Sequence, residues 1–560
     1  MSDRVSAWED TITFPTYTPP DADLNPMFLE KRVNQGTSGR VYPYPFLDRL
    51  SSESEPQDFT AVYLENEYIR LMMLPQIGGR IHEAVDKTNG YHFIYRQNVI
   101  KPALIGLFGA WASGGIEYNW PQHHRPSTFM PTQHLIEEHT DGSVTIWFSE
   151  NDPLQRMKGM VGVCLYPGKA FFEMKVQLYN RTPDVQTFLW WINVGVHVHD
   201  EYQVVFPPDV TVVTDHSKRS MSHYPVSHET YYGIDYEKGG EGTDLSWFDA
   251  IPVPTSYFVW DTDYDHFGGY DHRADAGIMH IANRHVAPGK KMFTWGAGEF
   301  AKGWEANLTD ADGPYIELMA GVYTDNQPDF SWLQPYETKT FSQFWYPVQK
   351  IGPAKNANRR AAVNLEGVKN GAESPRVIKL GVAVTERMAG ASLTLSAGDN
   401  TLMGRTVVLV PGTPFLAEVA CPKNVTETDL LLRLLDADGH EIIRYAPQEL
   451  EIPQLPEALT KDPTDVRCNN ALGLVAFRRG QFEKAKSHFQ TAIDKLTRRN
   501  PNPRDGEPYY NLGRTLKYQG DLDSAYDALY KAIWSYAWQA PAYTALAEID
   551  CHRGDFERAR

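Results

Sequence analysis

Residues 161–178 read VGVCLYPGKAFFEMKVQL, and this stretch decides the fold class of the first half of the chain. Phe172, Met174 and Val176 alternate with charged and polar residues, which is the period of two that a β-strand with one solvated face shows. Another apolar run precedes it and ends at residues 166–169, Tyr-Pro-Gly-Lys, where proline followed by glycine suits a type II turn. The two runs together predict a β-hairpin.

Similar short apolar runs extend the strand pattern over residues 59–350. They recur at Tyr68–Leu74, Val144–Ser149, Ile278–Ala282 and Phe341–Tyr346, and no helical periodicity of 10 to 15 residues separates them. Nearly 290 residues of antiparallel strand are too many for one open twisted sheet. We therefore expect two large sheets stacked face to face, a β-supersandwich.

Composition limits the partners and the setting of the protein. The chain has 560 residues, which implies about three or four domains, and its 71 acidic against 53 basic residues give a net charge of -18. An acidic excess disfavours nucleic acids and anionic membranes as partners, because both are polyanions. Four scattered cysteines indicate neither a disulfide framework nor a zinc site, and we find no apolar leader or membrane-spanning stretch. A cytoplasmic location is the simplest expectation.

The segments outside residues 59–350 predict three further parts. Residues 1–58 are rich in proline and polar residues, and we expect an arm that wraps onto the first domain. Residues 361–452 contain short strand patterns with a hairpin turn at Asp436–Gly439, which predicts an accessory β-sandwich. A proline-rich linker follows, and residues 464–560 are helical and repetitive.

The repeat is visible in the spacing of small residues. Gly480, Ala485, Phe489 and Ala492 follow Gly473 at offsets of 7, 12, 16 and 19, and the series that begins at Gly513 has the same offsets. This pattern resembles the tetratricopeptide repeat, in which small residues let two antiparallel helices approach. A third copy is cut at Arg560 in its second helix, so we expect the natural chain to continue, because a half repeat would leave an apolar face uncapped. The array could bind a protein partner or another copy of the chain.

Four short segments concentrate polar and aromatic residues that could bind or transform a ligand. The first contains Gly78, Gly79 and Arg80, and the second is Gly-rich and carries Glu117 with a run of other polar and aromatic residues. In the third, His197 and His199 lie two residues apart on a strand and thus on one face, and the fourth contains Glu317 and Asp325. The candidate ligand-binding side chains of these segments, and of the 267–272 segment, are Arg80, Asn119, Trp120, His123, His124, His199, Asp271, His272 and Asp325.

At these residues the sequence resembles the galactose mutarotase-like superfamily, whose β-supersandwich occurs in aldose epimerases and in many glycoside hydrolases. The resemblance implies that His197 is a general acid, that Glu317 is a general base and that Arg80 holds ring hydroxyls. The surroundings of His197 depart from the epimerase motif, so the acid could instead be His199. The β-sandwich joined to tetratricopeptide repeats also looks like a family of long bacterial proteins of unassigned function.

Acid–base chemistry at an anomeric carbon needs one group that donates a proton and another that removes one. Glu117 and Glu317 offer two carboxylates in aromatic surroundings, where burial could raise the pKa of one of them. Flanking one sugar ring, they would retain the anomeric configuration at a separation of about 5 Å and invert it at roughly 6.5–9.5 Å. Trp111 and Trp332 lie near these loops, and flat ring faces suit sugars.

The same residues have plainer interpretations. Glu117 could brace its glycine-rich loop, and Glu317 could form a structural ion pair. His197, His199 and Asp200 could bind a metal, although no further ligand at suitable spacing is evident, and we expect neither a metal nor a cofactor.

Three functions remain open at this stage. The chain is expected to be a carbohydrate-active enzyme, first of all a glycoside hydrolase in which Glu317 and Glu117 do the acid–base work assisted by His197. An aldose 1-epimerase acting on free sugars is the second possibility. A sugar sensor without catalysis, which docks a partner through its repeats, is the third.

Overall fold

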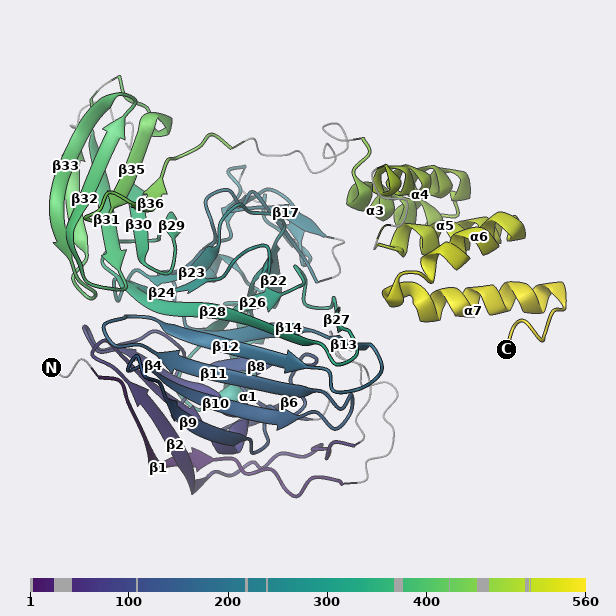
Figure 1. Ribbon diagram of the computed structural model, residues 1–560, viewed down its shortest axis with the longest axis horizontal. Coiled ribbons are helices and arrows are strands. Elements are labelled where there is room, and N and C mark those ends of the chain that lie inside the picture. Colours follow the sequence, from purple (N-terminus) through teal and green to yellow (C-terminus); the bar gives the residue numbers. More distant parts are fainter. Residues whose placement is uncertain are drawn as a thin grey trace. The chain divides into compact units, whose positions relative to one another are not determined.

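The computed structural model describes residues 4–24, 43–106, 109–216, 220–237, 240–366, 376–422, 424–450, 463–498, 503 and 505–560 (Figure 1). The chain divides into two compact units, Met1–Leu450 and Glu451–Arg560. The first unit is built from β-sheets and the second from helices, as the sequence predicts.

Two large sheets form the main part of the first unit. The 12-stranded sheet contains, in spatial order, β1 (Ser6–Thr16), β2 (Glu55–Glu65), β3 (Ile69–Leu74), β4 (Arg80–Asp86), β8 (Ile116–Asn119), β14 (Trp190–His197), β26 (Tyr315–Val322), β25 (Gly289–Thr294), β22 (Thr255–Val259), β16 (Val212–Thr214) and β17 (Met221–His223), and β5 (Tyr91–His92) pairs with β4. The 8-stranded sheet has the order β15 (Tyr202–Val205), β23 (His266–Asp271), β24 (Ala276–Ile281), β28 (Thr338–Gln349), β12 (Phe172–Tyr179), β11 (Lys158–Leu165), β10 (Val144–Asn151) and β9 (Gln133–Glu138).

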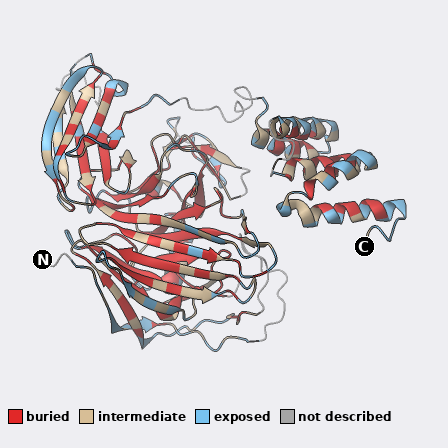
Figure 2. Cartoon of the chain, viewed as in Figure 1, coloured by how far each residue is buried: buried red, intermediate tan, exposed pale blue. Residues whose placement is uncertain are grey.

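The hairpin that the opening stretch predicts is the β11–β12 pair. Val161 pairs with Val176, and Gly168 in the connecting turn has a φ of +72°, a left-handed conformation that glycine adopts without strain. The alternating apolar residues point between the sheets, where Met174 and Val176 join Val194 and other residues of the 12-stranded sheet in one continuous core (Figure 2). The expectation of two stacked sheets is confirmed.

Two segments differ from the sequence-based expectation, since part of the expected N-terminal arm forms a strand and a helix lies within the β-region. Within residues 1–58, β1 pairs with β2 along its whole length and forms an edge strand of the 12-stranded sheet, with Phe14 buried. Ile12, Phe14 and Thr16 alternate with exposed residues, a short strand signal that the surrounding prolines obscure. Residues 25–42 lie outside the described part. The ten-residue helix α1 (Glu299–Leu308) was not expected, because it buries only Ala301 and Leu308 and therefore has little apolar periodicity.

Small two-stranded pairs decorate the large sheets. They are β6 (Pro102–Gly106) with β7 (Gly109–Ala112), β13 (Gln186–Phe188) with β27 (Ser331–Leu333), β18 (Val226–Ser227) with β21 (Thr243–Asp244), and β19 (Thr230–Tyr231) with β20 (Ile234–Asp235). The β6–β7 pair carries Ile105 and Trp111, which line a cavity.

A small β-sandwich follows within the same unit. One sheet contains β29 (Asn356–Ala357), β30 (Ala361–Glu366), β31 (Val377–Val384) and β34 (Phe415–Ala420), and the other contains β33 (Asn400–Leu409), β32 (Met388–Ala397), β35 (Leu430–Leu435) and β36 (Glu441–Tyr445). Both sheets contribute to one apolar core. The predicted turn at Asp436–Gly439 joins β35 to β36, and Gly439 has a φ of +85°.

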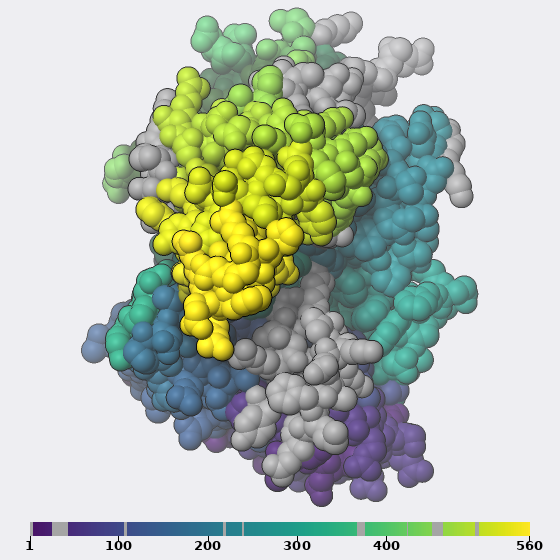
Figure 3. Space-filling model, turned by 90° about the vertical axis from the view of Figure 1, so that its right-hand side faces the viewer, coloured from purple at the N-terminus to yellow at the C-terminus, as the bar shows by residue number. Residues whose placement is uncertain are grey.

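The second unit contains the helices α3 (Val466–Arg478), α4 (Phe482–Thr497), α5 (Glu507–Gln519), α6 (Leu522–Ala532) and α7 (Tyr536–Arg553), which form one continuous body, light green to yellow in Figure 3. A Cβ atom on Gly473 would lie 2.4 Å from the ring of Phe489, and one on Gly513 would lie 2.6 Å from Leu529. The small residues of the repeat therefore let paired helices touch, as the pattern predicts. No helix in the described ranges is long and apolar enough to cross a membrane.

Candidate functional site

The candidate site lies on the face of the 12-stranded sheet that is turned away from the 8-stranded sheet. Along β26, Ile316 and Leu318 point into the core between the sheets. Because side chains alternate along a strand, Glu317 and Met319 point to the opposite face. The same alternation on β25 directs Met292 into the core and Lys291 to the face that Glu317 shares.

Strand pairing brings polar residues of four neighbouring strands together on this face. Glu117 on β8 pairs with Asn193 on β14, Asn193 pairs with Met319 on β26, and Met319 pairs with Lys291 on β25. Glu317 lies two residues from Met319 and thus in the adjacent row. Directly paired residues of antiparallel strands have their side chains on the same face about 5 Å apart. The register therefore fixes these side chains relative to one another.

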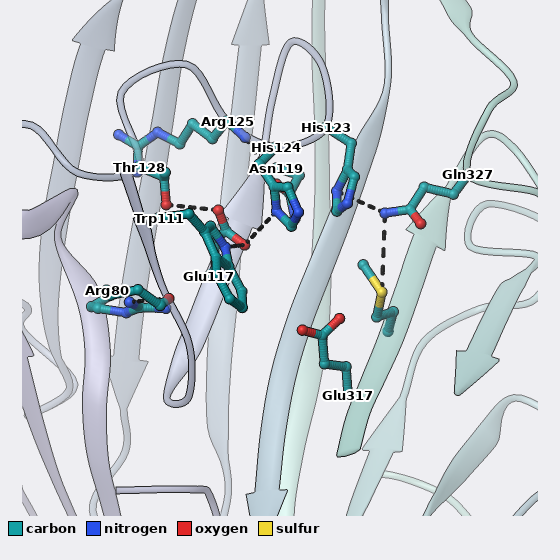
Figure 4. Close-up of polar contacts among 12 residues, drawn as sticks. Arg80, Trp111, Glu117, Asn119, His123, His124, Arg125, Thr128, Glu317 and Gln327 are labelled. Atoms are coloured by element: carbon teal, nitrogen blue, oxygen red, sulfur yellow. Dashed lines mark hydrogen bonds and ion pairs between the residues drawn. The ribbon is translucent and has the colours of Figure 1, made fainter. Parts of the chain in front are cut away.

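A cavity of about 190 Å³ opens above this face. Its walls combine aromatic rings, imidazoles, one carboxyl group, one amine and one amide, from Ile105, Trp111, His123, His124, His216, Lys291, Phe293, Trp295, Glu317 and Gln327. Three of the expected site residues, His123, His124 and Glu317, line it. Figure 4 shows the Glu317 carboxyl group pointing toward the side on which the rings of His123 and His124 lie.

Glu117 lies behind the cavity wall and holds His124 in place. Its Oε2 accepts hydrogen bonds from Trp111 Nε1 at 2.9 Å and contacts Nδ1 of His124 at 3.2 Å, and its Oε1 accepts one from Thr128 Oγ1 at 2.6 Å. Burial opposes ionisation, but the charge and hydrogen bond of His124, Arg80 and Thr128 outweigh it and lower the pKa of Glu117 to about 2. Glu117 is thus a fixed anion that orients the imidazole of His124 (Figure 4).

Glu317 has a different environment. It is buried, and burial raises its pKa above the ordinary 4.5, although Lys291 and His124 act in the opposite direction. Its Oε1 accepts a hydrogen bond from Tyr315 Oη at 3.1 Å. A carboxyl group with a raised pKa that faces a cavity is suited to exchanging a proton with a bound ligand.

Lys291 lies at another part of the same wall. Its Nζ donates a hydrogen bond to Oε1 of Gln327, and Nε2 of Gln327 lies 2.8 Å from Nδ1 of His123. Burial lowers the pKa of Lys291 to about 7 and places the pKa of His123 well below 6.5. Burial also lowers the pKa of His216, to about 2. Both imidazoles are therefore neutral at pH 7.

Arg80 supports the site from outside the cavity lining. Its Nη1 donates to the carbonyl oxygen of Ala112 at 2.6 Å and its Nη2 to that of Gly114 at 2.8 Å. The resemblance implied that Arg80 holds ring hydroxyls, whereas the buried guanidinium fixes the backbone that carries Trp111.

Two expected binding residues of the second segment are part of the protein interior. Oδ1 of Asn119 accepts a hydrogen bond from the backbone N–H of Arg125 at 2.9 Å, which anchors the loop that carries His123 and His124. Trp120 belongs to the core between the sheets.

The remaining expected residues lie elsewhere. His197 lies on the same sheet face, but its ring packs against Tyr95, with the ring centroids 4.1 Å apart, and it does not line the cavity. Asp325 follows β26 and does not line the cavity either. Asp271, the last residue of β23 in the 8-stranded sheet, and His272, which follows it, do not line the cavity either.

His199 and Asp271 form a separate polar cluster. His199 Nε2 lies 2.9 Å from Asp271 Oδ1. His199, Asp200 and Glu201 hold possible metal-ligand atoms within 4.8 Å of one another, a spacing that is short enough for one ion. However, Arg273 forms ion pairs with both Asp200 and Glu201, which provides these carboxylates with a partner.

The sequence interpretation did not select Lys291, His216, Phe293, Trp295 or Gln327 as site residues. Gln327 lies in the fourth polar segment and could have been chosen there. Lys291 had a weaker signal, two adjacent lysines in the strand-like GKKMFT. Alternation along a strand points the two lysines to opposite faces of the sheet. The sequence does not show that both faces are covered, so it does not indicate that each lysine is buried.

Three consecutive segments of the chain match known families. Residues 37–348, more than half of the chain, match the family described as "Domain of unknown function (DUF5107)". The chain belongs to the DUF5107 family. Residues 356–445 match the second domain of YphG-like proteins, and residues 466–533 match tetratricopeptide repeats, which confirms the predicted repeat.

One solved structure shares the fold over nearly the whole chain. A TPR-domain containing protein from Parabacteroides distasonis ATCC 8503 aligns with 99% of this chain and 85% of its own, at 19% identity and a TM-score of 0.53, which shows that the fold is shared beyond the DUF5107 domain. A putative aldose 1-epimerase from Klebsiella pneumoniae subsp. pneumoniae MGH 78578 aligns with 52% of this chain and 80% of its own, at 9% identity and a TM-score of 0.36. A galactose mutarotase-like protein from Clostridium acetobutylicum aligns with 52% and 96%, at 9% identity and a TM-score of 0.35.

Proposed function

We propose that the DUF5107 domain is an acid–base enzyme that interconverts the anomers of a single free sugar. The observation that carries this proposal is the cavity in which the Glu317 carboxyl group and the His124 imidazole share one wall region between aromatic rings. Aromatic rings suit the apolar C–H faces of a pyranose, and the two titratable groups suit its hydroxyl and ring oxygens.

In the proposed reaction, ionised Glu317 removes the proton of the anomeric hydroxyl while protonated His124 donates one to the ring oxygen. The bond between the ring oxygen and the anomeric carbon breaks, and the open-chain aldehyde forms. Rotation about the adjacent carbon–carbon bond and the reverse proton transfers then close the ring as the other anomer. Glu117 acts as a positioning residue, because it holds Nδ1 of His124 and thereby orients the imidazole.

The site supports this reaction better than glycoside hydrolysis, which the sequence favoured. Hydrolysis uses two carboxyl groups that flank the bond to be cleaved. Here Glu317 lines the cavity, whereas Glu117 lies behind Trp111 and His124 with a pKa of about 2. The volume of about 190 Å³ is also below the roughly 300–1,000 Å³ of typical ligand pockets, which favours one sugar ring over an oligosaccharide.

The proposal is tested by exchange NMR spectroscopy between the anomeric protons of a panel of free aldoses. Wild-type protein is expected to accelerate exchange of at least one of them, and Glu317→Gln is expected to reduce that rate by about 10²- to 10⁴-fold, because the general base is removed. Glu299→Gln, a change at an exposed residue of α1, is the matched control and should leave the rate unchanged.

The same panel distinguishes the alternatives. Hydrolysis of aryl glycosides that depends on both Glu117 and Glu317, without anomer exchange, would replace the proposal by a hydrolase. Sugar binding that survives Glu317→Gln, with no turnover of any substrate by the wild type, would indicate the sensor.

A further inference from the structure

The proposed reaction does not use the most unusual group in the cavity wall, the amine of Lys291. The residue is 3% exposed, and its Nζ lies 5.1 Å from the ring centroid of Phe258 and 5.7 Å from that of Phe293. These cation–π contacts offset only part of the cost of removing an ammonium group from water, and a nearby anion would compensate for the rest.

Within the described ranges, Lys291 has no carboxylate partner within 4 Å. Its one hydrogen bond in this part of the chain is to the neutral amide of Gln327, and the carboxyl group whose charge acts on it is Glu317. Salt bridges are common elsewhere in the unit, for example between Arg125 and Glu150 at 3.0 Å. Lys291 is therefore a buried cation site that the described side chains leave without a paired anion.

The neighbouring groups are arranged as hydrogen-bond donors. Because Nε2 of Gln327 donates to Nδ1 of His123, neutral His123 carries its proton on Nε2. His123 and Lys291 both line the cavity, so two residues that carry N–H groups border the same space. N–H donors grouped around one amine favour an oxyanion as ligand.

We propose that the sugar bound in this cavity carries an anionic group, a carboxylate or a phosphate monoester, which pairs with Lys291. This inference rests on the proposed function, because it concerns the substrate of the same site. Glu117 lies on β8 and Lys291 on β25, three strand positions apart, which at about 4.8 Å per strand is roughly 14 Å. The acidic group of the sugar thus binds toward β25, Glu317 on β26 lies next to it, and His124 lies on the side of Glu117.

Anion binding at Lys291 also predicts a proton effect. With a pKa of about 7 before binding, Lys291 is about half protonated at pH 7. A bound anion favours the ammonium form, so binding at pH 7.5 to 8 takes up protons from the buffer. Neutral sugars would cause no such uptake through Lys291.

Isothermal titration calorimetry of the full chain tests the inference with matched sugars. Glucose, glucuronate and glucose 6-phosphate form one series, and galactose and galacturonate form another; the carboxylate and phosphate arms distinguish the two kinds of anion. Wild-type protein is expected to bind an acidic sugar at least ten-fold more tightly than its neutral counterpart, with an apparent enthalpy that depends on the buffer because protons are taken up.

Lys291→Met is expected to abolish this preference. The matched control is Lys290→Met, the same change at the adjacent buried lysine, which points to the other face of β25 and does not line the cavity. Lys290→Met should retain the preference. A Lys291→Arg variant keeps a cation at the position and should keep part of the preference.

The inference is overturned when no acidic sugar binds more tightly than its neutral counterpart, or when the preference survives Lys291→Met. Failure of the proposed function looks different. Acidic sugars would then bind in a Lys291-dependent manner, yet their anomers would not exchange faster with wild-type protein than with Glu317→Gln. Conversely, exchange of neutral sugars without any charge preference would support the proposed function and overturn the inference.

Discussion

Replacement of Lys290 by methionine should stabilise the first unit. Lys290 points into the core between the two large sheets and is 1% exposed. Its Nζ has no hydrogen-bond partner among the described residues, and burial lowers its pKa from the ordinary 10.5 to about 8. At about 1.4 kcal/mol per pKa unit, folding with this amine protonated costs about 3 kcal/mol. Methionine has a similar length and no charge, so Lys290→Met should recover most of that amount at pH 7.

The stability difference between Lys290→Met and the wild type should depend on pH in a defined direction. Between pH 8 and 10.5 the unfolded chain binds more protons at Lys290 than the folded chain does, so this lysine makes the stability of the wild type rise with pH there. The stability difference between Lys290→Met and the wild type should therefore be largest below about pH 8 and should vanish by about pH 10.5.

Thermal unfolding of both proteins at several pH values measures this difference. With about 2.1 cal/mol/K of unfolding entropy per residue over the 450 residues of the unit, 3 kcal/mol corresponds to an increase in Tm of about 3 °C at pH 7. Lys379→Met, at an exposed position of β31, is the control and should change stability by less than about 0.5 kcal/mol. A destabilised Lys290→Met protein, or a difference that does not vary with pH, would refute the reasoning.

Three further predictions concern the cavity and the repeats. Glu117→Gln should destabilise the first unit by about 3 kcal/mol at pH 7, because the native contacts that lower the pKa of Glu117 stabilise its ionised form. This loss of stability should disappear as the pH falls from 4.5 toward 2, where the wild-type carboxylate also becomes protonated, and denaturant unfolding at pH 7, 5, 4 and 3 measures it. His197→Gln should leave anomer exchange within two-fold of the wild-type rate in the NMR assay, because His197 does not line the cavity; a hundred-fold loss would return it to the mechanism. Gly513→Ala should destabilise the α5–α6 pair by about 1–3 kcal/mol, because the added Cβ atom would meet Leu529. The control Gly303→Ala in α1 adds a Cβ atom that meets no atom within 4 Å, and it should stabilise the protein by roughly 0.5–1 kcal/mol. Hydrogen exchange of the helix amides in the full chain measures both changes.

The sequence predicted the fold well where local periodicity is strong. The β11–β12 hairpin alternates regularly and turns at proline and glycine, and the repeat places small residues at Gly473 and Gly513, where the helices touch. These features depend on residues that are close in the chain. Helix α1 and strand β1 were not predicted, because their apolar residues are few and lie next to glycine or proline.

The site was predicted less completely, because it depends on which strands become neighbours. Glu317 and His124 could be selected from their polar and aromatic surroundings. Lys291 could not, since only the β25–β26 pairing brings it beside Glu317. His197 shares a sheet face with Glu317, as alternation predicts, but Tyr95 packs against its ring, a contact between residues a hundred positions apart.

The alternation along β26 ties folding and chemistry to a single register. A slip of one residue would direct Ile316 and Leu318 into the cavity and would force the Glu317 carboxyl group into the layer between the sheets. No misregistered form could therefore fold stably and still present Glu317 to the cavity. Insertions and deletions in this strand are therefore disfavoured for both reasons at once, and the cavity lining can vary more freely through substitutions and through the segments that carry Trp111, His123 and His124.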